Sequence, residues 1–162
     1  MKKFRLVSLF LLIALLATVG SAAADSSRNF RAQLSDAPGD VVNSSARGIS
    51  LFQLSRDGKS MHFKLGVANI ENVTMAHIHV AAAPGENGPP AVWLYPDGPP
   101  PQLIPGRFDG VLARDSFTAA DFAGLLAGME MADLVTAIEE GRAYVNVHTL
   151  QVPGGEIRGD IH

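Results

Sequence analysis

Alternation of apolar and polar residues on either side of a tight-turn dipeptide constrains the fold of this chain most strongly. In residues 60–67 every second side chain is apolar, and Gly48–Leu54 is a second strand candidate. Asp57-Gly58 lies between the two segments. Side chains alternate across a β-strand, and Asp-Gly between two such segments is the strongest short-range signal of a β-hairpin. We therefore predict an antiparallel hairpin here.

The rest of the chain predicts further strands and a helical insertion. Strand candidates lie at residues 29–34, 73–80, 91–95, 106–112, 143–149 and 155–161, separated by loops rich in proline and glycine. Thr118 is a candidate N-cap for a short helix through Leu126, and the apolar spacing from Met131 to Ile138 predicts an amphipathic helix that stops at Gly141. We predict a mainly β fold: an antiparallel β-sandwich or Greek-key barrel with a short helical insertion before the last two strands.

The first 24 residues have the order of a secretory signal peptide. Three basic residues within the first five positions precede the apolar run Ser8–Val19, and small residues follow at 20–24. The apolar run is shorter than the roughly 20 residues that span a bilayer. We expect cleavage after Ala24 and export of residues 25–162 as a single domain to the periplasm or the extracellular medium. No membrane span is expected after cleavage.

Composition excludes several classes of function. The chain has no cysteine, which excludes disulfides, thiolate catalysis and cysteine-based metal sites. Three of the 13 basic residues and none of the 16 acidic residues lie in the leader, so residues 25–162 carry ten basic residues and a net charge of −6. This charge argues against a nucleic-acid partner and against electrostatic binding to anionic lipid. Phosphate-binding glycine loops and nucleophile elbows are missing, so the sequence gives no reason to predict an enzyme.

Three of the five histidines could share one ligand. His77 and His79 are separated by one residue in a strand candidate, so both side chains point to the same face. His148 lies near the end of the strand candidate 143–149. A third imidazole from a neighbouring strand would complete a three-histidine site for copper or zinc. The same side chains could instead form hydrogen bonds that pin loops at one end of the sandwich, and the sequence leaves both interpretations open.

Three other side chains are candidates for ligand binding. Trp93 and Tyr95 share one face of a predicted strand and could bind carbohydrate or peptide, although a lone tryptophan also serves as a core anchor. Arg158 lies between Glu156 and Asp160 on one strand face, which is typical of an ion network. Beside a bound copper ion, Arg158 could also steer an anion.

The sequence has recognisable motifs at residues 76–79, 85–88, 141, 144–149 and 153–159. Together they resemble the CHRD (chordin-type) domain. The resemblance spans about Phe30 to Ile161 and departs from the usual family pattern at Asp36–Val42. CHRD domains occur in exported bacterial proteins and, as several copies, in chordins, which bind growth factors. The resemblance implies a β-sandwich or barrel with no general enzymatic activity, and a single copy gives no reason to expect growth-factor binding.

The sequence supports two hypotheses about function. The first is an exported CHRD domain that acts as a non-enzymatic binding or envelope-associated module for an unknown protein or small ligand. The second is a copper- or zinc-binding β-barrel protein that uses His77, His79 and His148. Its His-x-His pair with a later strand histidine is similar in pattern to the Cu/Zn superoxide dismutases, so its role would be metal sequestration or dismutation.

Overall fold

The structure is a computed structural model that describes residues 28–37 and 43–162. The predicted signal peptide and cleavage site lie outside the described residues. The elements are β1 (Asn29–Asp36), β2 (Arg47–Leu54), β3 (Ser60–Val80), β4 (Pro90–Tyr95), β5 (Ile104–Thr118), the 3-10 helices η1 (Ala119–Asp121) and η2 (Gly124–Leu126), α1 (Met131–Glu139), β6 (Ala143–Thr149) and β7 (Ile157–Asp160).

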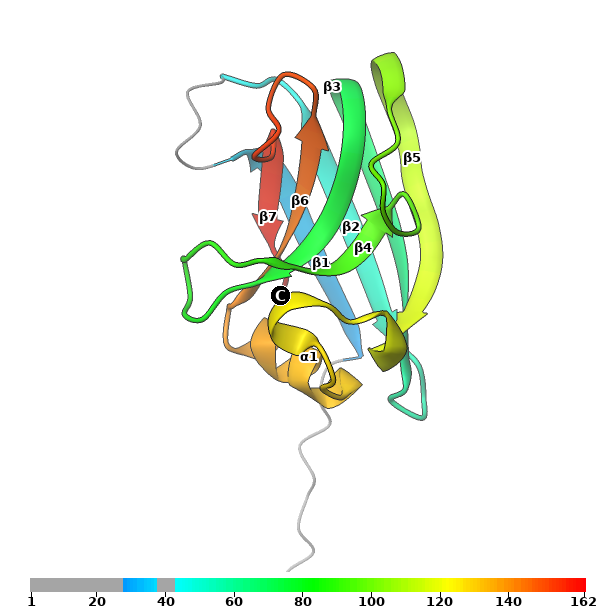
Figure 1. Ribbon diagram of the computed structural model, residues 1–162, viewed down its shortest axis with the longest axis vertical. Coiled ribbons are helices and arrows are strands. Elements are labelled where there is room, and N and C mark those ends of the chain that lie inside the picture. Colours follow the sequence, from blue (N-terminus) through cyan, green and yellow to red (C-terminus); the bar gives the residue numbers. More distant parts are fainter. Residues whose placement is uncertain (1–27, 38–42) are drawn as a thin grey trace, which may run out of the picture.

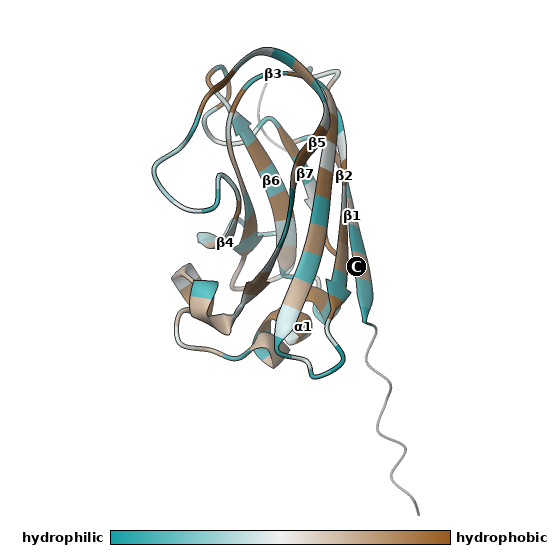
Figure 2. Cartoon of the chain, turned by 90° about the vertical axis from the view of Figure 1, so that its right-hand side faces the viewer, coloured by the Kyte–Doolittle hydropathy of each residue, from teal (hydrophilic) through white to brown (hydrophobic). Residues whose placement is uncertain are grey.

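Strand alternation builds the core. Buried and exposed residues alternate along β1, β2 and the first half of β3, and the pattern is visible as successive teal and brown bands along the strands in Figure 2. The predicted hairpin forms around Asp57-Gly58, with Phe52 opposite Phe63 in antiparallel register. Each inward position therefore contributes an apolar side chain to one shared interior.

The strands close into a barrel. β1 pairs with β2, β2 with β3, β3 with β6, β6 with β7, and β7 with β1, and every one of these pairs is antiparallel. β4 and β5 are further strands that pair with β3. Closure leaves few free edges and confirms the predicted mainly β, barrel-like fold.

β3 is one long strand where the sequence predicted two. It bends at residues 69–72, where Asn69 and Asn72 have positive φ angles of 61° and 53°. Asparagine tolerates the left-handed region better than most residues, so the chain can turn there without ending the strand. The first half of β3 pairs with β2 and β5, and the second half pairs with β6 and β4 (Figure 1).

Two further predictions need correction. β5 extends beyond the predicted 106–112 at both ends and includes Pro105; β3 is the one strand described as pairing with it, and such an edge position tolerates proline. The helix predicted from Thr118 to Leu126 is instead two 3-10 turns. Thr118 caps the first turn as expected, but Gly124 has a φ of +55°, which breaks the helical path.

The predicted amphipathic helix α1 lies with the 3-10 turns at one end of the barrel (Figure 1). Its buried stripe includes Met131, Leu134 and Ile138, and Gly141 follows its end with a φ of 70°. Among the described helices, none has the length and apolar character needed to cross a bilayer.

Candidate metal site

The second half of β3 brings two histidines to one face of the barrel wall. Ala76, Ile78 and Val80 point into the core and are fully buried. His77 and His79 therefore lie on the opposite face, as the spacing predicted. They are nevertheless only 2% and 6% exposed, because loops cover this part of the strand.

Strand pairing brings the third histidine to the same place. In the β3–β6 register, His148 lies opposite Met75, two positions before His77, so it shares the face of His77. His148 is 5% exposed. The structure therefore unites the three residues that the sequence singled out as one site.

The three imidazoles converge. Their ring centroids are 5.1, 5.6 and 5.7 Å apart, close to an equilateral triangle, and one ring nitrogen from each lies within 4.8 Å of the others. Nδ1 of His77 lies 3.2 Å from Nε2 of His148. This separation is that of a hydrogen bond between the two rings.

Backbone carbonyls orient two of the rings. Nδ1 of His79 donates to the carbonyl oxygen of Gly88, and Nδ1 of His148 donates to that of Pro153, each at 2.9 Å. A neutral imidazole that donates from Nδ1 has a bare lone pair on Nε2. Such contacts from the outer nitrogen fix tautomer and ring orientation in metal sites.

The protonation pattern leaves buried acceptors without donors. Because Nε2 of His148 is a bare acceptor, the 3.2 Å contact requires His77 to donate from Nδ1 when all three rings are neutral. Nε2 of His77 and Nε2 of His79 are then lone pairs, and both are buried without a hydrogen-bond partner. Unpartnered buried polar atoms are rare in folded proteins and point to a missing partner such as an ion.

Burial keeps the site uncharged. It lowers the pKa of His77 to about 3 and that of His79 to about 4, and it also lowers the pKa of His148. For His77 the charges of the two neighbouring histidines lower the pKa further. Neutral imidazole is the form that binds metal, so the three rings are ready to bind a cation at neutral pH.

Aromatic rings and one cation surround the cluster. Tyr144 stacks on His79 with centroids 5.0 Å apart, and the guanidinium carbon of Arg158 lies 3.3 Å from the centroid of the Tyr144 ring. Arg158 also donates to Asn87 Oδ1 at 2.7 Å, which ties it to the loop that carries Gly88. Arg158 is thus engaged in holding this loop and the Tyr144 ring.

The two aromatic candidates on β4 take different places. Trp93 packs edge-on against His77 with centroids 4.2 Å apart. Tyr95 instead packs against the hydrophobic core. A register shift in the β3–β4 pairing between Ala76 and His77 accompanies the difference, so alternation in the sequence did not predict it.

The sequence did not predict the residues that orient the rings of His79 and His148. Gly88 and Pro153 act through backbone carbonyls, which carry no side-chain signature. Gly88 does leave one trace, because a Cβ there would overlap the carbonyl oxygen of Val80. A glycine in a proline-rich loop can therefore mark a close backbone approach, but the partner is visible only in the fold.

A second residue of β6 also belongs to this face. Asn146 lies opposite His77 in the register and donates from Nδ2 to the carbonyl oxygen of Gly154 at 2.9 Å. This bond helps to hold the β6–β7 loop that carries Pro153.

Comparison with known proteins identifies one family. A family model described as the CHRD domain matches residues 30–161. Comparison with curated proteins and with solved structures gives no match.

Proposed function

The chain belongs to the CHRD domain family, and on that basis we propose that it is an exported, non-enzymatic binding module whose ligand is one copper or zinc ion. The ion is held by His77, His79 and His148. The observation that carries the proposal is the convergence of three buried imidazoles with two unpartnered Nε2 lone pairs.

Loop pinning alone explains only part of this arrangement. It accounts for the bonds from His79 to Gly88 and from His148 to Pro153. It does not account for His77, which has no contact with a loop carbonyl and whose Nε2 has no partner. A cation among the three rings would satisfy the bare lone pairs that otherwise cost free energy in the interior.

Burial of the three histidines supports stable binding of an ion rather than catalysis by it. The three ligands are between 2% and 6% exposed. Three histidines leave the fourth position of a tetrahedral ion without a protein ligand, but the burial of the site restricts access of a substrate to that position. A buried set of three neutral imidazoles suits sequestration of copper or zinc, both of which accept imidazole nitrogen.

Export is part of the proposal and rests on the leader sequence. Its basic start, the apolar run Ser8–Val19 and the small residues at 20–24 support secretion. A site without cysteine keeps its ligands in an oxidising compartment, because imidazole, unlike thiolate, does not form disulfides.

Elemental analysis of the mature protein, purified without a histidine tag, tests the metal site. We expect one equivalent of copper or zinc in the wild type and none in a variant with His77, His79 and His148 changed to Ala. His62→Ala is the matched control, because His62 is exposed on the same strand outside the cluster and its loss should leave the metal content unchanged.

A second measurement separates loss of metal from loss of fold. The electron paramagnetic resonance spectrum of wild-type protein loaded with Cu(II) should show hyperfine coupling to imidazole nitrogens. His79→Gln should reduce that coupling, while the near-ultraviolet circular dichroism spectrum stays like that of the wild type. Failure of the folded wild type to retain either metal after incubation with excess copper and zinc ends the metal hypothesis. The histidines are then loop pins, and the ligand of the module is of another class.

A further inference from the structure

A cationic row crosses the outer face of the barrel, on strands that the metal site does not use. In the strand register Arg31 lies opposite Leu51, Leu51 opposite Lys64, and Lys64 opposite Arg114. Like charges directly opposite each other on neighbouring strands are unfavourable. The Arg31 side chain donates to His162, but the side chains of Lys64 and Arg114 have no hydrogen bond or ion pair with any residue that the structure describes.

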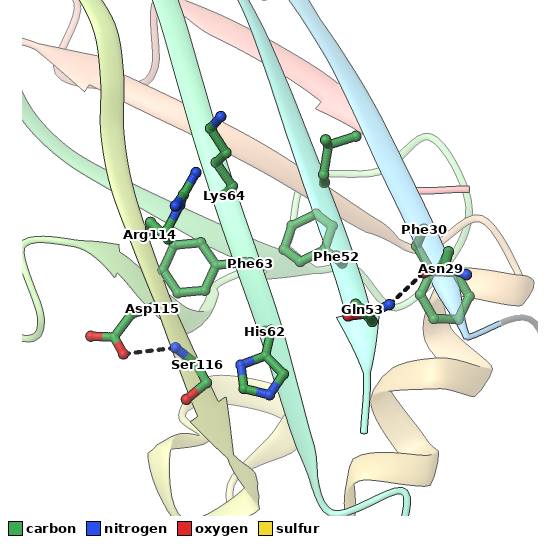
Figure 3. Close-up of a pocket in the computed structure, with 11 residues that line it drawn as sticks. Asn29, Phe30, Phe52, Gln53, His62, Phe63, Lys64, Arg114, Asp115 and Ser116 are labelled. Atoms are coloured by element: carbon green, nitrogen blue, oxygen red, sulfur yellow. Dashed lines mark hydrogen bonds between the residues drawn. The ribbon is translucent and has the colours of Figure 1, made fainter. Parts of the chain in front are cut away.

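This row borders a hollow of about 590 Å³ that lies over β1, β2, β3 and β5. Figure 3 shows Lys64 and Arg114 next to one another on neighbouring strands, with His62 and Gln53 further along the hollow. The one acidic residue in its lining is Asp115, whose Oδ1 accepts a hydrogen bond from the Ser116 amide. The hollow is therefore cationic although the predicted mature chain has a net negative charge.

A second hollow of about 400 Å³ continues along the same face and is apolar. Its floor is Gly66, which lies opposite Ile49 on one side and Val111 on the other. Ile49, Val111 and the adjoining Leu51 are 46%, 49% and 48% exposed. We call the two hollows together the outer trough.

No steric contact requires glycine at position 66. A Cβ at this position would meet no atom closer than 3.7 Å, and the backbone of Gly66 is not in the left-handed region. Glycine in a strand interior often marks a bulge or a close approach of a ligand to the backbone, and Gly66 lies at a register shift in the β3–β5 pairing. Here the missing side chain leaves an apolar channel between Ile49 and Val111.

We propose that the outer trough binds a single anionic amphiphile, a long-chain carboxylate of the fatty-acid type. Lys64 and Arg114 bind the carboxylate, and the chain lies over Gly66 between Ile49 and Val111. Sites for small ligands are mostly apolar hollows of about 300–1,000 Å³ with a few placed polar groups, which describes this trough. Two cations beside an apolar hollow match the charged head and the apolar chain of one such molecule.

Calorimetric titration of the purified wild-type protein with laurate, below its micelle concentration, tests the proposal. We expect saturable binding of laurate and none of dodecanol, because the neutral head cannot bind the two cations. The double variant Lys64→Glu/Arg114→Glu should weaken binding about tenfold or more. Lys59→Glu is the control, since Lys59 lies in the hairpin turn outside the trough and should bind as wild type.

A second variant tests the floor of the outer trough at Gly66. Gly66→Val should fill the channel and weaken laurate binding about tenfold while urea unfolding shows an intact fold. Absence of laurate binding, equal binding of dodecanol, or unchanged affinity in both variants overturns the proposal. Binding to phosphatidylglycerol vesicles without binding of laurate also overturns it, in favour of a membrane surface. None of these results depends on the metal content.

Discussion

At the scale of single residues, each site histidine uses its two ring nitrogens differently. His79 and His148 each donate one N–H to a loop carbonyl and turn the other nitrogen toward the cluster. His77 has no loop partner and contacts His148 instead. One set of side chains thus fastens two loops and presents lone pairs at a common point, which combines the two roles that the sequence left open.

Stability of the metal-free protein should fall with falling pH. Unfolded histidines take up protons near the ordinary pKa of 6.5, but His77 and His79 resist protonation in the folded state down to about pH 3 and 4. Their contribution is fully present above pH 7 and is lost as the unfolded state becomes protonated. At pH 5 we expect a loss of about 2 kcal/mol for each of the two residues.

Urea unfolding at pH 7.5 and pH 5 measures this loss. A His77→Gln/His79→Gln variant should show a flatter pH dependence. Equal stability of the wild type at both pH values would contradict the burial argument.

Substitution of Gly88 should damage both the fold and the site. In Gly88→Ala the added Cβ meets the Val80 carbonyl, so the loop must move, at a cost of about 1–3 kcal/mol. The loop carbonyl that orients His79 moves with it, so metal affinity should fall too. Gly66→Ala is the matched control, because its Cβ meets no close atom. Chemical denaturation of both variants checks the expectation, which fails if they are equally stable.

At the scale of elements, β3 organises the molecule. It pairs with four other strands, and its bend at Asn69–Asn72 lets the first half join the outer-trough face and the second half carry His77 and His79. The loops after β3 and β6 fold back over that second half through Gly88 and Pro153. The metal site therefore depends on one strand and two loops that are distant in sequence.

Truncation of two neighbouring residues on β3 should change the stability of the protein by very different amounts. Leu65 is fully buried, so Leu65→Ala should cost about 2–5 kcal/mol through lost burial and the cavity that remains. Lys64→Ala, one position earlier on the exposed face, should change stability by no more than about 0.5 kcal/mol. Equilibrium unfolding of the two variants measures the contrast, and similar values would contradict the placement of Leu65 in the core and Lys64 on the surface.

At the scale of the whole molecule, closure of the barrel separates two surfaces. The metal site lies on the second half of β3 with β6, and the outer trough lies on the first half with β2 and β5. The two sites share no residue, so metal binding and carboxylate binding can be tested independently.

Metal binding should stabilise the whole barrel, because the three ligands converge only in the folded state. At a free metal concentration 100 times the dissociation constant, the expected gain is about 2.7 kcal/mol, or roughly 10 °C in Tm. Differential scanning calorimetry of the wild type with and without zinc or copper measures it. The triple variant at His77, His79 and His148 should show no shift, and an equal shift in both proteins would place the metal elsewhere.

Local stereochemistry made several features predictable from the amino-acid sequence alone. Alternation predicted the hairpin around Asp57-Gly58 and the common face of His77 and His79, because successive side chains of a strand point in opposite directions. The spacing in residues 131–138 predicted α1 for the same kind of reason. The CHRD resemblance, carried by motifs along the chain, is confirmed by the family match.

The meeting of distant segments, in contrast, is a property of the folded barrel. The β3–β6 register brings His148 to His77, a bulge separates Tyr95 from Trp93, and the loops deliver the carbonyls of Gly88 and Pro153. Register and loop docking depend on pairings between residues far apart in the chain, where a shift of one position reverses every side chain. Local periodicity contains no information about strand register or loop docking. Both are determined by packing in the closed barrel.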